Sequence, residues 1–205
     1  MVLEYKVLFG SIAVLLAIGS YIPYVRDMFL GRTKPHAISW FIWGTLTAIG
    51  FAAQVSEGAG AGAWVTGVSA LACYGIALFA FAKGDRSYST FDWWSLVAAA
   101  VALILWVVMS EPLVALVLVI LTDACGYLPT VRKAYARPHE ETATTYAISS
   151  VKWVLAFPAL AVVNLTTILY PAFLVVVNGG FALFLVIRRR QLAKTPRKRS
   201  QARRK

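Results

Sequence analysis

Two oppositely charged side chains lie inside long apolar stretches of this chain. Asp123 falls within the apolar run 112–135, and Lys152 falls within the run 143–163. At about 1.5 Å of rise per helical residue, they lie roughly 16 Å and about 14 Å from opposite ends of the two runs. Both depths are close to the middle of a hydrocarbon layer about 30 Å thick, so we expect both charges near the midplane of a membrane.

A charge at the midplane costs at least about 2.5–3.5 kcal/mol to insert. One interpretation is a buried ion pair that locks two consecutive antiparallel helices together. The other places Asp123 and Lys152 on a water-accessible path, where they contact a polar solute or exchange a proton. Intramembrane charges usually mark pathways, so we favour the second interpretation and leave the first open.

Polar and aromatic residues accompany this pair. Tyr127 follows Asp123 by about one helical turn, Ser149 lies on the helix face of Lys152, and Trp153 comes next in the chain. Aromatic faces combined with hydroxyl and amide groups suit a small polar metabolite. The residues that we assign to a substrate pathway are Asp123, Lys152, Tyr127, Asn178, Trp153, Ser149, Tyr21 and Trp43.

Other aromatic residues have a plainer interpretation. Trp64, Trp93, Trp94 and Tyr170 lie near the ends of apolar runs, where Trp and Tyr commonly anchor a helix at the membrane surface. We therefore assign these four to interfacial belts rather than to a pocket.

The composition defines the class of protein. Hydrophobic residues make up 60% of the chain and its mean hydropathy is +0.70, whereas soluble domains are roughly 45–50% apolar. We expect an all-α membrane protein with seven transmembrane helices. The predicted spans are 7–30, 37–54, 60–82, 92–109, 112–135, 143–163 and 167–187.

An internal repeat divides these spans into two related halves. The segment 19–26 contains Tyr, Pro, Val and Arg in the same order and spacing as the segment 125–132. Each half has three spans, an odd number, so the intervening span must restore the direction of the chain. The sequence therefore predicts two parallel three-helix repeats joined by a linker helix. The predicted units are residues 1–86 (first repeat), 87–110 (linker helix), 111–190 (second repeat) and 191–205 (a disordered basic tail).

Each repeat carries a proline inside its first span, Pro23 and Pro129. A proline removes one backbone hydrogen bond and kinks a helix. The kinks are either fixed features of packing or hinges that open one side of the bundle. Their repetition at equivalent depths favours hinges.

Basic residues orient the bundle. They cluster after the first, third, fifth and seventh spans, and the opposite connections carry almost none. The positive-inside rule then places the N-terminus outside and the C-terminus in the cytoplasm, in a plasma (inner) membrane. The net charge of +11 comes largely from the tail. Directly after a span, such a tail indicates attraction to anionic lipid headgroups rather than to nucleic acid.

This arrangement resembles the SWEET and PQ-loop superfamily of membrane proteins. The resemblance rests on the three-plus-one-plus-three spans and on a proline followed three residues later by arginine in each repeat. The Pro-Gln pair that gives the superfamily its name is replaced by Pro23-Tyr24 and Pro129-Thr130. SWEETs are built from parallel repeats, and the resemblance implies that Asn178 lines a solute pocket.

These features predict a transporter that moves a small polar solute, a sugar or an amino-acid-like metabolite, by alternating access. A non-transporting receptor or scaffold on the same bundle is the alternative, although short loops favour transport. We expect no enzyme, because the chain has neither a nucleophile constellation nor a metal cluster, and no metal or cofactor. Protons are candidate coupling partners. Whether the protein forms a homo-oligomer is left undecided by the sequence, since one chain already holds both halves of a site.

Overall fold

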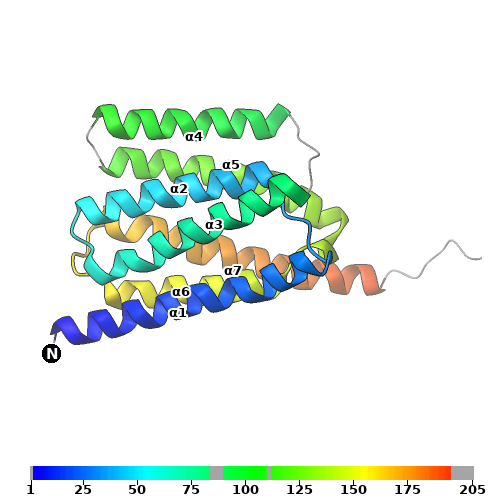
Figure 1. Ribbon diagram of the computed structural model, residues 1–205, viewed down its shortest axis with the longest axis horizontal. Helices are drawn as coiled ribbons and strands as arrows, with labels where there is room; N and C mark the ends of the chain where they lie inside the picture. The colour runs from blue at the N-terminus through cyan, green and yellow to red at the C-terminus, as the bar shows by residue number, and fades with distance from the viewer. Residues whose placement is uncertain (1, 84–89, 110–111, 195–205) are drawn as a thin grey trace, which may run out of the picture.

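The computed structural model describes residues 2–83, 90–109 and 112–194, and within them every regular element is a helix. Figure 1 shows the α-helices side by side in one bundle. They are α1 (Val2–Phe29), α2 (Ala37–Ser56), α3 (Trp64–Lys83), α4 (Thr90–Met109), α5 (Pro112–Ala136), α6 (Ala143–Ala156) and α7 (Leu165–Lys194). Short 3₁₀ helices, η1 (Gly60–Ala63), η2 (Pro138–Glu140) and η3 (Phe157–Ala159), lie in the connections. The predicted all-α class is confirmed.

Among the described residues, four segments are long and apolar enough to cross a membrane: Glu4–Phe29, Ala37–Ser56, Gly60–Lys83 and Leu165–Ala193. Their mean hydropathies lie between 1.3 and 2.1. At about 1.5 Å per residue, even the shortest reaches the roughly 30 Å that the hydrocarbon layer requires. The length and composition of these helices fit a helical membrane protein. Spans at 92–109, 112–135 and 143–163 stay predictions.

The sixth predicted span, 143–163, is wrong at its end. Helix α6 stops at Ala156, and Pro158 lies in η3, after which Leu160 adopts an extended backbone. Proline has no N–H for the helix ladder, so the helix ends just before it. The residue after Leu160 bonds the connection between α2 and α3 instead: the Ala161 N–H donates to Ala59 O at 2.9 Å.

Helix α7 is longer than the predicted span 167–187. It begins at Leu165 and continues to Lys194, past the boundary that we predicted between the second repeat and the tail. The rest of the predicted tail, 195–205, lies outside the described residues.

The helices pack in a regular pattern. Helix α3 packs against α1 and α2, and α7 packs against α5 and α6. The first helix of each group also contacts the second helix of the other, as α1 with α6 and α5 with α2. Helix α4 contacts α5 and α2 and lies at the edge of the bundle (Figure 1).

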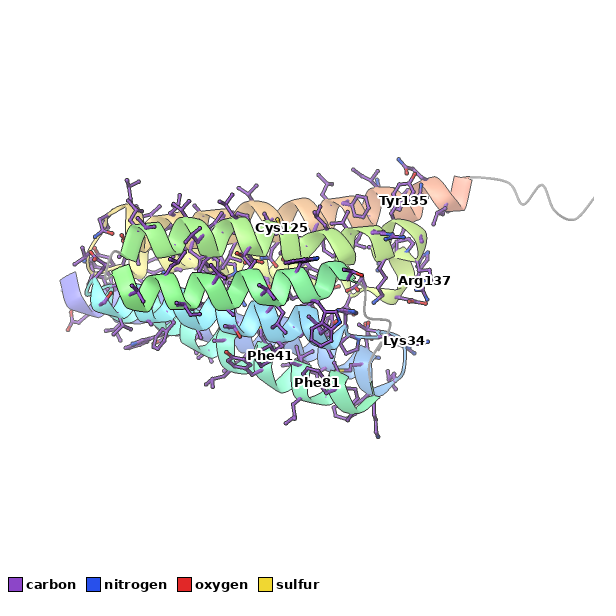
Figure 2. The ribbon with its side chains drawn as sticks, turned by 90° about the horizontal axis from the view of Figure 1, so that it is seen from above. Lys34, Phe41, Phe81, Cys125, Tyr135 and Arg137 are labelled. Carbon is purple, nitrogen blue, oxygen red and sulfur yellow. The ribbon has the colours of Figure 1, made fainter. Side chains whose placement is uncertain are left out.

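The two ends of the bundle differ in charge. Lys34, Tyr135 and Arg137 lie at the same end, as Figure 2 shows, and the last turn of α3 carries Lys83. We call this the basic end. The opposite end, which holds Glu57 and Asn164, is called the far end below. Helix α1 begins at the far end and α7 finishes at the basic end (Figure 1).

Candidate functional site

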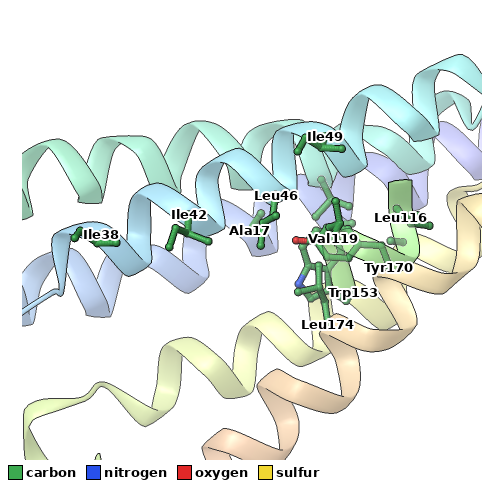
Figure 3. Close-up of a cluster of buried hydrophobic side chains, with 13 residues drawn as sticks. Ala17, Ile38, Ile42, Leu46, Ile49, Leu116, Val119, Trp153, Tyr170 and Leu174 are labelled. Atoms are coloured by element: carbon green, nitrogen blue, oxygen red, sulfur yellow. The ribbon is translucent and has the colours of Figure 1, made fainter. Parts of the chain in front are cut away.

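A cavity lies inside the bundle between its two large clusters of buried side chains. Trp153 and Leu174 of its lining belong to one cluster, and Trp43 and Tyr127 belong to the other. Figure 3 shows Trp153, Leu174 and Tyr170 gathered against Val119 of α5. The residues around this central cavity are Tyr21, Trp40, Trp43, Thr47, Ser69, Cys73, Asp123, Tyr127, Thr145, Tyr146, Ser149, Lys152, Trp153, Leu174 and Asn178.

The cavity brings together every residue that the sequence assigned to the substrate pathway. They come from both halves of the chain: α1 and α2 supply Tyr21 and Trp43, whereas α5, α6 and α7 supply the others. Its volume is about 50 Å³, and because a water molecule needs at least about 10–15 Å³, there is room for a few.

Lys152 is held by neutral partners from the first half of the chain. Its side chain is buried, with 1% exposed. The Nζ atom donates to Ser69 Oγ at 2.9 Å and to Tyr21 Oη at 3.3 Å. It also lies 4.5 Å from the centre of the Tyr21 ring and 5.1 Å from that of Trp153, within the range of cation–π attraction. Hydroxyl oxygens and aromatic faces therefore compensate part of the cost of burying this ammonium group.

Asp123 is equally buried but less completely bonded. It is 1% exposed, and Tyr170 Oη donates to Asp123 Oδ2 at 3.1 Å. The other carboxyl oxygen, Oδ1, has no hydrogen-bond partner in the structure. Among the described residues, no ion pair within 4.0 Å joins Asp123 to Lys152. The two charges thus share a cavity without forming the buried lock that we left open.

Unpartnered polar atoms gather around this cavity. Besides Asp123 Oδ1, the Trp43 Nε1 donor and the Thr145 Oγ1 hydroxyl are buried without a hydrogen-bond partner. Trp43 Nε1 faces α5, because a Cβ atom at Gly126 would lie only 3.7 Å from it. Native proteins leave few such groups unsatisfied, so three of them in the lining of one cavity mark it as a polar site.

The remaining pathway residues complete an aromatic and polar wall. The rings of Trp43 and Tyr127 lie 5.0 Å apart, and those of Trp43 and Trp40 lie 5.2 Å apart. Asn178 Nδ2 donates to the Leu174 carbonyl at 2.8 Å, which fixes the amide beside the cavity. The wall presents flat apolar faces interrupted by a few polar groups, a common composition for small-molecule sites.

Two residues that bond the buried charges, Tyr170 and Ser69, were not predicted from the sequence. Tyr170 was assigned to an interfacial belt, but it is 0% exposed and bonds both Asp123 and, at 3.2 Å, Thr47. Its spacing gives the signal that was overlooked, because Tyr170 and Asn178 lie two helical turns apart on one face of α7. Ser69 was missed because nothing in its local sequence indicates that it faces Lys152.

The two candidate hinge positions, 23 and 129, both lie inside helices. Pro23 lies inside α1, which continues past it to Phe29. Position 129 lies within α5, but the Pro129 side chain is outside the described residues.

Contacts between the halves cross the bundle on both sides of the cavity. At the basic end, Thr142 Oγ1 donates to Asp27 Oδ2 at 3.0 Å, and Lys133 Nζ donates to Lys34 O at 2.8 Å. Lys133 also forms an ion pair with Glu141 at 2.9 Å.

Hydrogen bonds cross between the halves at the far end as well. Asn164 Nδ2 donates to Glu57 Oε2 at 2.8 Å, and Gln54 Nε2 donates to Thr167 O at 3.3 Å. The central cavity is therefore flanked by polar contacts between the halves at each end of the bundle.

The fold and the cavity define a bundle that contains helices long and apolar enough to cross a membrane, with Asp123 and Lys152 unpaired with each other inside it. Comparisons of the chain with protein-family models, curated proteins and solved structures find no match. Within the described residues, no group of three or more His, Cys, Asp or Glu side chains is placed to hold a metal ion.

Proposed function

We propose that this protein transports a small polar solute across a membrane by alternating access, with the central cavity as its binding site. The observation that carries the proposal is the pair of buried, mutually unpaired charges, Asp123 and Lys152, in one cavity. A purely structural core gains nothing from two such charges, because burying them is costly. A solute site gains the groups that bind and orient its ligand.

The helix contacts support a bundle built from two parallel three-helix repeats. If α1, α2 and α3 correspond to α5, α6 and α7, the contact of α1 with α3 corresponds to that of α5 with α7. Likewise, the contact of α2 with α3 corresponds to that of α6 with α7. The same correspondence maps the contact of α1 with α6 onto the contact of α5 with α2. This is also the arrangement implied by the resemblance to the SWEET and PQ-loop superfamily.

The end contacts support alternating access. Asp27 and Lys133 occupy equivalent repeat positions, and each bonds a residue of the opposite half, Thr142 and Lys34 respectively. Hydrogen bonds of this kind can break at one end while the other end stays closed. Rocking of one repeat against the other would then expose the cavity to each side in turn.

The charge distribution supports a cytoplasmic basic end. Lys34, Lys133 and Arg137 lie there, and α7 reaches that end with Arg188 and Arg189. Orientation follows the positive-inside rule, and the basic groups attract anionic headgroups on that surface.

Uptake into liposomes containing the purified protein tests the proposal. A panel of labelled sugars and amino acids would be compared with protein-free liposomes. For a solute that enters, Lys152→Met and Trp43→Phe should each lower the rate about tenfold or more, because each removes a hydrogen-bond donor from the cavity.

Matched controls separate a loss of the site from a loss of folding. Lys83→Met and Trp94→Phe make the same chemical changes at exposed positions, and both should transport at the unsubstituted rate. If a ligand binds but no solute of the panel crosses the membrane, transport is rejected in favour of a receptor or scaffold.

A further inference from the structure

Asp123 and Lys152 are the charged side chains among the described residues that line the central cavity. Each is contacted only by neutral groups: Tyr170 donates to the carboxylate, the Trp43 side chain also interacts with it, and Ser69 and Tyr21 accept from the ammonium. No counterion for either charge lies within 4.0 Å in the described structure. The cavity therefore presents one positive and one negative group that are separate from each other and uncompensated.

The unsatisfied atoms add directional information. Asp123 Oδ1 can only accept, so it requires an N–H or O–H donor. Trp43 Nε1 can only donate, and Thr145 Oγ1 can do either. Lys152 has three N–H donors, of which two are used by Ser69 and Tyr21. A fitting ligand thus offers a donor toward Asp123 and an acceptor toward Lys152.

The charge of the ligand follows by elimination. An anion would compensate Lys152 but would be repelled by Asp123, and a cation would meet the opposite conflict. A neutral solute such as a sugar would satisfy hydrogen bonds while leaving both charges without a counterion. When both side chains are ionised, only a molecule with both charges compensates them at once.

We infer that the ligand of the central cavity is a small zwitterion that carries a primary ammonium group and a carboxylate, as a neutral amino acid with a short side chain does. The inference rests on the proposed function of this cavity as a solute site. Its ammonium group donates to Asp123 Oδ1 beside the rings of Trp43 and Tyr127, and its carboxylate accepts from Lys152. The cavity volume of about 50 Å³ favours a compact ligand.

Equilibrium binding to the full chain in lipid nanodiscs, measured by titration calorimetry, tests the charge requirement. The probes are alanine, which carries both charges, propionate and ethylamine, which carry one each, and glucose, which carries none. Glycine betaine serves as a zwitterion without N–H donors. We expect alanine to bind at least about tenfold more tightly than every other probe.

Two substitutions then assign each charge to its end of the ligand. In Asp123→Asn the preference for alanine over propionate should disappear, and in Lys152→Met the preference for alanine over ethylamine should disappear. Thermal unfolding of each variant reports whether it folds. The comparison of probes on the unsubstituted chain decides the inference even if a variant does not fold.

The possible results distinguish this inference from the proposal of transport. Tightest binding of glucose, or equal binding of alanine and a singly charged probe, would overturn the zwitterion and leave transport standing. No alanine binding at all would also overturn it. Alanine binding without alanine flux in liposomes would uphold the zwitterion site and reject transport.

Discussion

The hydrogen bond from Tyr170 to Asp123 offers a quantitative test of the buried carboxylate. Tyr170→Phe removes the hydroxyl without changing the ring, and its neighbours keep their packing. The lost hydroxyl bonds Asp123 Oδ2 at 3.1 Å and Thr47 at 3.2 Å. A hydrogen bond to a charged group contributes about 1.5–3 kcal/mol, and one between neutral groups contributes about 1 kcal/mol. We therefore expect a loss of about 2–4 kcal/mol in the free energy of unfolding.

A second substitution isolates the part that belongs to the carboxylate. Asp123→Leu is similar in shape and removes both oxygens, so Tyr170→Phe in that background should cost only the bond with Thr47, about 1 kcal/mol. The difference between the two backgrounds is the coupling energy, expected at about 2 kcal/mol.

Chemical unfolding in mild detergent of the four proteins in this double-mutant cycle measures the coupling. Because Asp123→Leu also removes a buried charge, that substitution alone should cost little or even stabilise the bundle. Equal costs of Tyr170→Phe in both backgrounds, within about 0.5 kcal/mol, would refute the hydrogen bond and its role in holding Asp123.

Two further predictions concern packing and the basic end. A Cβ atom at Gly62 would lie 2.5 Å from Leu160 Cδ2 and 2.9 Å from its Cα, so Gly62→Ala should lower the free energy of unfolding by about 1–3 kcal/mol. Gly75→Ala, with no atom within 4 Å of the added methyl group, should be neutral or stabilising, and a cost equal to that of Gly62→Ala would contradict the contact. Lys133→Met removes the bonds to Lys34 O and Glu141, so hydrogen exchange of the amides at the basic end should quicken. Unchanged exchange there would show that Lys133 does not hold that end closed.

The helices could be predicted because apolar runs and prolines define them locally. Helix α2 begins at the predicted Ala37 and α5 at the predicted residue 112, each just after a polar connection. The end of α6 was misplaced because the apolar pattern continues through 163, although Pro158 interrupts the backbone hydrogen bonds. Neither hydropathy nor a proline alone defines a helix end, because α6 stops before Pro158 whereas α1 continues past Pro23.

The site was predictable to the extent that burial alone marks it. A charge inside an apolar run has few acceptable locations, so Asp123 and Lys152 could be placed in the interior from sequence. Their partners could not be predicted, because Ser69 and Lys152 meet across a contact between α3 and α6 that no local pattern encodes. Tyr170 was misassigned because proximity to a span end was weighed above its helix face.

The origin of these partners bears on how the cavity would open. Lys152 belongs to the second half, but Ser69 and Tyr21 belong to the first. Asp123 and Tyr170 belong to the same half. If the halves move against each other as proposed, the Asp123–Tyr170 bond travels intact, whereas the bonds of Lys152 must break. A bound carboxylate would supply Lys152 with a replacement acceptor at that moment, so the ligand would lower the barrier to its own passage. Ser69→Ala removes one competing acceptor. This substitution should therefore speed the interconversion between the states that open the cavity to either side of the membrane, and it should do so more without ligand than with ligand.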